Sequence, residues 1–178
     1  VDIIKWINLM PMLDKFIKSP YKEDNELVYA VINGVLEKED LQNEEALKEL
    51  NLCLSDVWIS SEVNKARWSA YFLNLQKTID YCWEAGTIVG HGRGSGVGFL
   101  LLYALDIIQI NTLRERTKTF RFRFLNPERV SVLDIDTDIS GKKRGIVLSY
   151  LRKKYGVDRI ANVLTLGTEK SKSAILTA

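Results

Sequence analysis

Three aspartates on alternate residues are the chemical feature of this sequence that most needs an explanation. Asp134, Asp136 and Asp138 lie in the stretch VSVLDIDTDIS, which otherwise has the apolar and β-branched residues of a buried strand. Alternate residues of a strand share one face, so the three carboxylates are expected to point the same way and to repel one another. A bound Mg²⁺, which prefers carboxylate, water and phosphate oxygens, would relieve that repulsion. The alternative is an exposed strand with a solvated acidic face.

A glycine-rich loop precedes the aspartates in the chain. Glycine alternates through VGHGRGSGVG, and the apolar run FLLLYAL follows at once. Backbone N–H groups in such a loop, together with the N-terminus of the next helix, can bind an anion, and Arg93, Gly94 and Ser95 lie at its centre. The spacing matches neither the Rossmann nor the P-loop pattern. With the acidic strand, this loop favours phosphoryl or nucleotidyl transfer over a simple packed glycine turn.

Other reactive residue types are scarce, which narrows the chemistry. His91 is the only histidine, so a histidine-based zinc site or Ser-His-Asp catalysis is not expected. Cys53 and Cys82 have no metal-binding spacing and fall in expected helices, which predicts buried, reduced thiols rather than a disulfide. Catalysis would therefore depend on carboxylates, Lys, Arg and a divalent ion.

Charge is distributed unevenly along the 178 residues. The net charge of +2 combines a net −6 over residues 1–89 with a net +8 over residues 90–178. Two basic blocks, Arg114 to Arg129 and Lys142 to Lys154, predict that the C-terminal half faces a polyanion, with solvated helix faces as the alternative. The sequence has neither a long apolar run nor a signal-peptide pattern, so no membrane partner and a cytoplasmic location are expected.

The pattern of apolar residues predicts helices first and a sheet later. Helices are expected over residues 25–40, with Asp24 as the N-cap, over 43–50, and over 60–86, with Gly86 ending the last. Strands are then expected over 87–90, 120–124, 130–139 and 161–166, with helices over 98–108, over 141–156 and from 167. This order indicates an α/β or α+β sheet domain after a helical region.

Three stretches of the chain carry a family resemblance. VGHGRGSGVGFLLLYAL, RFLNPERVSVLDIDTDI and RKKYGVDRIANVLTLGTEKSKSA, in that order, resemble the palm region of the alpha subunit of bacterial DNA polymerase III, the C-family replicative polymerases. The resemblance covers roughly residues 66–178, and the FLNPERVS stretch before Asp-Ile-Asp makes it specific. It implies an α+β fold in which a helical region, residues 1–65, precedes an incomplete polymerase-beta-like nucleotidyltransferase palm with a mixed sheet, residues 66–178.

The resemblance also implies site residues and partners. Asp134 and Asp136 match the two catalytic, metal-binding aspartates of the family, and Asp138 matches a further acid of the same strand. The implied cofactor is Mg²⁺ in a two-metal site, with Mn²⁺ as a substitute, and the implied substrates are primer-template DNA and deoxynucleoside triphosphates. The rest of the polymerase chain and other replisome proteins are the implied partners. Phosphate-binding positions are implied at Arg93, Gly94, Ser95, Arg123, Arg129 and Lys172, with Arg123 and its neighbours also relieving the repulsion between the acids.

Several positions depart from the family pattern. His91 and Leu133 replace prolines, Ile139 replaces a phenylalanine, and the stretch FRFRF before Asn126 is unusual. These departures indicate a divergent member, and a phage source is compatible with them. Because the family's third catalytic aspartate and its later modules lie beyond Ala178, we expect a fragment that does not polymerise DNA alone.

Two other functions remain open from the sequence. A non-templated nucleotidyltransferase of the same palm type would use the same acids and glycine loop, although FLNPERVS argues against it. A non-catalytic nucleic-acid-binding or replisome-assembly module would use the basic blocks without metal chemistry. DNA affinity that falls steeply with salt but ignores Mg²⁺ would favour this second function.

Overall fold

The computed structural model describes residues 16–114, 120–126, 128 and 133–163. The chain divides into two compact units, Val1–Arg144 and Gly145–Ala178. In the second unit the described regular structure is helix α6, Arg144–Tyr155, and a 3₁₀ turn, Val157–Arg159. No helix within the described ranges is long and apolar enough to cross a lipid bilayer.

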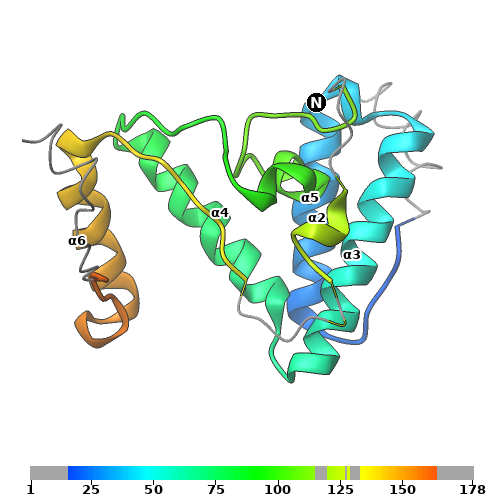
Figure 1. Ribbon diagram of the computed structural model, residues 1–178, viewed down its shortest axis with the longest axis horizontal. Helices are drawn as coiled ribbons and strands as arrows, with labels where there is room; N and C mark the ends of the chain where they lie inside the picture. Colours follow the sequence, from blue (N-terminus) through cyan, green and yellow to red (C-terminus); the bar gives the residue numbers. More distant parts are fainter. Residues whose placement is uncertain (1–15, 115–119, 127, 129–132, 164–178) are drawn as a thin grey trace, which may run out of the picture. The chain divides into compact units, whose positions relative to one another are not determined.

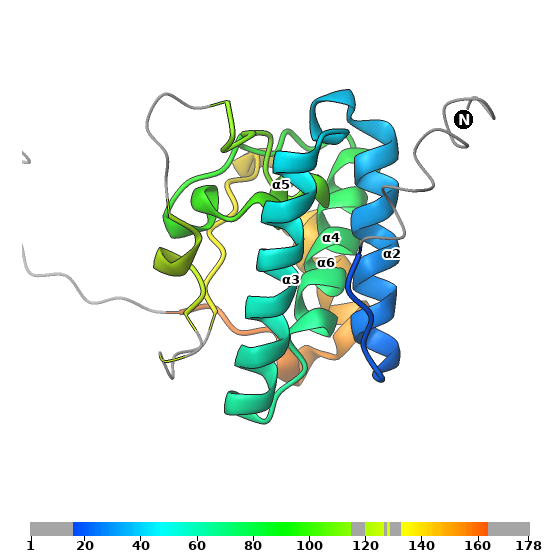
Figure 2. The ribbon, with the colours of Figure 1, turned by 90° about the vertical axis from the view of Figure 1, so that its right-hand side faces the viewer.

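Helices build the core of the first unit. The helices are α2 (Lys22–Glu37), α3 (Glu44–Asn64), α4 (Trp68–Glu84) and the short α5 (Leu100–Ala104). Helices α2 and α3 both pack against α4, and α5 packs against α2 and α3 (Figures 1 and 2). The apolar stripes of these helices meet there, which removes Leu27, Leu50 and Phe72 completely from solvent.

One close helix crossing sets the position of α5. A Cβ atom added to Gly34, in α2, would lie 1.9 Å from the Ala104 carbonyl oxygen at the end of α5. No side chain fits in that space, so glycine is what allows the two backbones to touch. The helix that follows the glycine-rich loop is thereby held directly against α2.

Local signals in the sequence predict two helix boundaries correctly, the start of α3 and the end of α4. The Asn43 side chain caps α3 by accepting a hydrogen bond from the Ala46 N–H at 2.9 Å, and Gly86 (φ +66°) follows the end of α4. The predicted N-cap Asp24 is wrong, because α2 begins at Lys22 and the buried Asp24 carboxylate instead accepts hydrogen bonds from Ser19 and Ser69. The helix expected over 43–50 continues as α3 to Asn64, and the single helix expected over 60–86 is divided at Lys65, where the backbone is left-handed.

The predicted mixed sheet, and with it the α+β palm, is wrong. Where the chain is described, its β pairing is limited to one isolated antiparallel bridge between Val89 and Ile139. Residues 133–138 are irregular rather than a regular strand. A sheet needs neighbouring strands whose N–H and C=O groups pair, and apart from this bridge the described segments pair with none. The described fold is therefore helical.

The other expected strands also differ from the prediction or lie outside the described residues. Phe120–Phe124 was expected to be a strand, but Arg121–Arg123 forms a 3₁₀ turn. The Arg121 guanidinium bonds Asp56 on α3 at 2.8 Å, which draws this segment onto that helix. Residues 161–163 have no regular structure. The rest of the strand expected over 161–166, and the helix expected from 167, lie outside the described residues.

Candidate functional site

The Val89–Ile139 bridge brings the glycine-rich loop to the acidic segment. The Gly90 N–H donates to the Asp138 carbonyl at 2.8 Å, and the Ser140 N–H donates to the Ile88 carbonyl at 3.1 Å. These bonds join segments almost fifty residues apart in the sequence. Two of the features singled out from the sequence, the loop and the aspartates, therefore form one site.

Arg93 supplies the counter-charge to the acids. Its Nη1 lies 3.1 Å from Asp136 Oδ2, and its Nε lies 3.0 Å and 3.1 Å from the two carboxylate oxygens of Asp138. The planar guanidinium has donors in a fixed fork, so one side chain can span two carboxylates. Arg93 thus opposes the repulsion between Asp136 and Asp138, whereas the sequence predicted bound metal ions together with Arg123 and its neighbours for this role.

The backbone at Gly94 approaches the acids closely. Gly94 has φ +71°, and a Cβ atom there would lie 2.9 Å from Asp136 Oδ2. A side chain would be strained by the backbone and would also contact the carboxylate. The 3₁₀ turn Ser95–Gly98 begins at once, so Ser95 is held next to Gly94. Glycine at position 94 thus allows a close approach between the loop and an acidic side chain.

An aromatic cluster packs the C-terminal side of the glycine-rich loop against the helical core. The Phe99 ring lies 4.9 Å from Phe124 and 6.1 Å from Phe72, centroid to centroid. Phe72 belongs to α4, and Phe99 lies between the 3₁₀ turn and α5. All three rings are buried, so the loop is fixed to the helical core at its C-terminal side.

Tyr71 and Lys143 link α4 to the acidic segment and to the residues that follow it. Burial raises the pKa of Tyr71 on α4, and so does the nearby charge of Asp134, while the Ile135 backbone lowers it. Lys143 Nζ donates to the carbonyls of Ala85 and Gly86 at 2.7 Å and 3.1 Å. Lys143 belongs to the basic block Lys142 to Lys154. No sequence spacing marks either contact.

The remaining predicted site residues are distributed as follows. Asp134 is exposed on the acidic segment, and Arg123 is exposed at the end of its 3₁₀ turn. Arg129 and Lys172 lie outside the described residues. The structure therefore joins Arg93 and Gly94 to Asp136 and Asp138, and it shows no contact from Arg123 to these acids in the part of the chain that it describes.

Carboxylate donors in this site have the right chemistry for Mg²⁺, which is bound by oxygen atoms. Within the described ranges, however, no group of three or more His, Cys, Asp or Glu side chains gathers closely enough to hold a metal ion. Asp134 and Asp136 could supply two ligands, with water and substrate phosphate completing the coordination. Arg93 currently bonds one of those two carboxylates.

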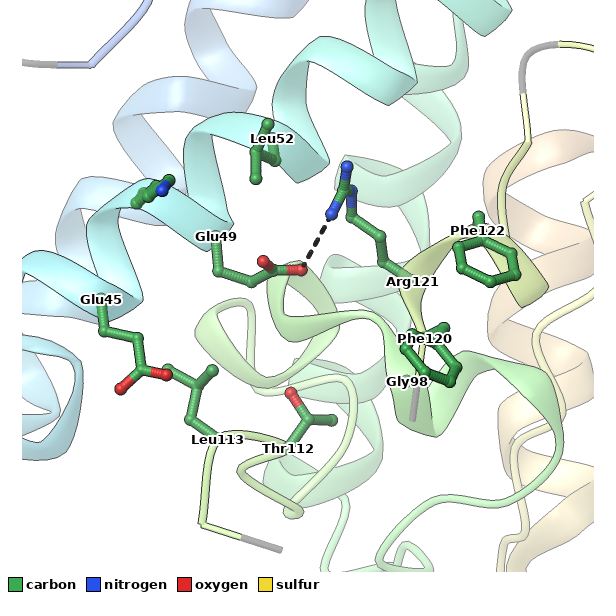
Figure 3. Close-up of a pocket in the computed structure, with 10 residues that line it drawn as sticks. Glu45, Glu49, Leu52, Gly98, Thr112, Leu113, Phe120, Arg121 and Phe122 are labelled. Carbon is green, nitrogen blue, oxygen red and sulfur yellow. Dashed lines mark ion pairs between the residues drawn. The ribbon is translucent and has the colours of Figure 1, made fainter. Parts of the chain in front are cut away.

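A pocket of about 420 Å³ lies elsewhere in the first unit, between α3 and the Arg121–Arg123 turn (Figure 3). Its wall includes Glu49, whose carboxylate lies 3.7 Å from Arg121 Nη1, as Figure 3 shows. The stacked rings of Phe120 and Phe122 form its rim and are largely exposed. Neither Arg93 nor the three aspartates line this pocket, so it is separate from the acidic site.

Comparison with known proteins gives a consistent set of matches. The family model described as bacterial DNA polymerase III alpha NTPase domain matches residues 58–178. The DNA polymerase III subunit alpha of Thermus aquaticus is 43% identical over 115 residues, which cover 65% of this chain and 9% of that protein. The probable DNA polymerase YorL of Bacillus subtilis strain 168 is 32% identical over 177 residues, which cover 93% of this chain and 13% of that protein.

A phage protein is among these relatives. The DNA-directed DNA polymerase of Bacillus phage SPbeta is also 32% identical over 177 residues. This match confirms the resemblance predicted from the sequence, while the source of the present chain stays a prediction. The chain spans 9% to 13% of the length of these three relatives.

Proposed function

Because the chain belongs to the bacterial DNA polymerase III alpha NTPase-domain family, we propose that it is part of a DNA-directed DNA polymerase and carries part of the nucleotidyl-transfer site. The observation that carries this proposal is the pairing of the glycine-rich loop with the acidic segment, through the 2.8 Å bond from the Gly90 N–H to the Asp138 carbonyl. Phosphate-binding and metal-binding groups are both needed for this reaction, and that pairing supports their acting together.

The reaction is attack by the 3′-hydroxyl oxygen of a primer on the α-phosphorus of a deoxynucleoside triphosphate. A new P–O bond forms, the bond to the β-phosphate oxygen breaks, the hydroxyl proton leaves to solvent, and pyrophosphate is released. Mg²⁺, when bound, would activate the hydroxyl and neutralise charge on the leaving pyrophosphate. Asp134 and Asp136 would hold it, with Asp138 as a further candidate ligand.

This chain's own groups would bind and orient the triphosphate. Backbone N–H groups of the loop at Gly94, with the Ser95 hydroxyl and the Arg93 guanidinium, would donate to phosphate oxygens. Fixed donors of this kind stabilise charge that develops in the transition state, because they need no reorganisation during the reaction. Further phosphate-binding residues are proposed at Arg123, Arg129 and Lys172.

The experiment that tests the proposal is Mn²⁺ binding by the 178-residue chain, followed by the electron paramagnetic resonance signal of the free ion. Asp134→Asn and Asp136→Asn should each weaken binding about tenfold or more, which corresponds to about 1.4 kcal/mol. Asp80→Asn is the matched control, because Asp80 is an exposed carboxylate on α4 that belongs to neither the glycine-rich loop nor the acidic segment. It should leave the affinity unchanged.

Equal Mn²⁺ affinity in wild type, Asp134→Asn and Asp136→Asn would refute the metal site. If the chain binds DNA with a steep salt dependence and binds no Mn²⁺, the non-catalytic nucleic-acid-binding module is the better description. Primer extension by the chain alone is expected to be undetectable, because the proposed site is only part of the polymerase site.

A further inference from the structure

Arg93 holds two of the proposed site's carboxylates at once. Its guanidinium contacts Asp136 at 3.1 Å and both oxygens of Asp138 at 3.0 Å and 3.1 Å. The contact is open to water, because the side chains of Arg93, Asp136 and Asp138 are 54%, 38% and 62% exposed. Ion pairs with this exposure are weak, so other ions can displace them.

The backbone holds this arrangement in place. The Gly90–Asp138 hydrogen bond fixes the register of the two segments, and a Cβ atom at Gly90 would lie 3.0 Å from Asp138 Cβ. Gly94, whose φ is +71°, follows Arg93 directly, and a Cβ atom there would lie 2.9 Å from Asp136 Oδ2. Arg93 therefore belongs to a loop whose backbone already lies close to Asp136 and Asp138.

A metal ion and a triphosphate would each need a group that the ion pair between Arg93 and the two carboxylates already uses. A cation at Asp136 needs the carboxylate oxygen that Arg93 Nη1 occupies, and a triphosphate needs the guanidinium that the two carboxylates occupy. Both demands are met only if Arg93 changes partners. A metal ion and a triphosphate would then help each other to bind, because each takes one side of the ion pair.

We propose that Arg93 is a positioning residue that exchanges partners: it pairs with Asp136 and Asp138 when the site is empty and transfers to the triphosphate when substrate and metal bind. This rests on the proposed function, because it requires that the same site bind both. Asp136 and Asp138 are thereby partly neutralised without a metal, and the site opens to a cation as the nucleotide arrives.

The test measures two affinities that should change in opposite directions. Mn²⁺ binding without nucleotide is followed by electron paramagnetic resonance, and binding of a fluorescent deoxyadenosine triphosphate analogue in excess Mg²⁺ is followed by anisotropy. Arg93→Gln should bind Mn²⁺ about two- to fivefold more tightly than wild type, as expected for the loss of a competing exposed ion pair. The same variant should bind the triphosphate more weakly.

Two further variants separate partner exchange from simpler effects. Arg93→Lys keeps the positive charge but loses the planar fork that spans both carboxylates. If Arg93 exchanges partners, this variant should bind Mn²⁺ more tightly than wild type. If only the positive charge of residue 93 matters, its Mn²⁺ affinity should equal that of wild type. Lys77→Gln removes one positive charge from an exposed position of α4 and should alter neither affinity. Circular dichroism shows whether each variant is folded. If Arg93→Gln does not fold, Arg93→Lys takes its place in the test.

The outcomes distinguish the two proposals. If Mn²⁺ binds to wild type and is lost in Asp136→Asn, but Arg93→Gln and Arg93→Lys bind it no more tightly than wild type, the exchange is refuted and the metal site stands. If both affinities fall together, Arg93 has only a structural role and the exchange is again refuted. If no chain binds Mn²⁺ through Asp134 and Asp136, the proposed function fails and the exchange fails with it.

Discussion

Individual polar residues in this chain form contacts that tie distant segments together, and Asp40 is an example away from the acidic site. Its carboxylate accepts hydrogen bonds from Asn111 at 2.7 Å and from Tyr103 at 3.0 Å, and Arg114 Nε lies 3.5 Å away. Burial alone would raise the pKa of Asp40, but these donors and the guanidinium outweigh it, so the pKa lies below its ordinary value of 3.8. The ionised form is therefore the one that the fold stabilises.

Replacing Asp40 with asparagine should change how stability depends on pH. A carboxylate whose pKa is lowered by folding stabilises the protein above its unfolded pKa, and that contribution is lost as pH falls through the folded pKa. Wild type should exceed Asp40→Asn by about 1–3 kcal/mol at pH 7, and the difference should shrink from about pH 5 downward. Urea unfolding at a series of pH values measures it.

The control for this experiment is Glu26→Gln. Glu26 forms an exposed i,i+4 pair with Lys22 at 3.6 Å, and such pairs contribute little. Its stability curve should follow that of wild type at every pH. Parallel curves for wild type and Asp40→Asn would show that the carboxylate does not contribute as described.

Elements were predictable from the sequence where local interactions form them, and not where distant ones do. The Asn43 cap and the Gly86 stop depend on neighbouring residues, and both are confirmed. The sheet required pairing between distant segments, and the alternation in Phe120–Phe124 could not reveal that Asp56 draws Arg121 onto α3. At the site, the residue types in the loop and the acids were visible in the sequence. The contacts of Arg93, Tyr71 and Lys143 depend on the tertiary structure.

Two glycine-to-alanine changes should have opposite effects because of their surroundings. Alanine is favoured over glycine inside a helix by up to about 1 kcal/mol. At Gly34 the new methyl group would lie 1.9 Å from the Ala104 carbonyl oxygen, and overpacking of this kind costs about 1–3 kcal/mol or more. At Gly145, in α6, nothing lies within 4 Å of the added Cβ atom.

Thermal unfolding followed by circular dichroism compares these two variants. Gly34→Ala should lower the Tm, whereas Gly145→Ala should leave it unchanged or raise it. A stable Gly34→Ala protein with a normal Tm would mean that α2 and α5 do not cross as closely as the structure describes.

On the scale of the whole molecule, the chain combines an acidic first half with a basic second half. Residues 90–178 carry the net charge of +8, and in the second compact unit Arg152 and Lys153 are exposed on α6. Lys154 is partly engaged, because its ammonium lies over the Tyr150 and Tyr155 rings. The 177-residue match to the Bacillus subtilis relative covers 93% of the chain, so it also includes much of the region before residue 66.

If the basic half contacts nucleic acid, exposed cations of α6 should contribute to DNA affinity through counterion release. Each phosphate contact adds about 0.9 to the slope of log affinity against log salt concentration. Arg152→Gln combined with Lys153→Gln should therefore reduce the slope by up to about 1.8. Fluorescence anisotropy with a labelled primer-template at several salt concentrations measures it.

The matched control removes two cations from the acidic half. Lys22→Gln combined with Lys77→Gln changes the net charge by the same amount at exposed helix positions, and it should leave the slope unchanged. Equal slopes for all three proteins would show that α6 does not contact the DNA backbone.

The contact between Lys143 and the end of α4 fixes a length of chain as well as a position. The Ser140 N–H is bonded to the Ile88 carbonyl, and three residues later Lys143 Nζ is bonded to Ala85 and Gly86. The residues between these two points act as a spacer. Deleting one of them while Lys143 keeps its contacts would move Ile139 to the place of Ser140, opposite Ile88. Ile135 and Thr137, rather than two carboxylates, would then take the places of Asp136 and Asp138 beside Arg93.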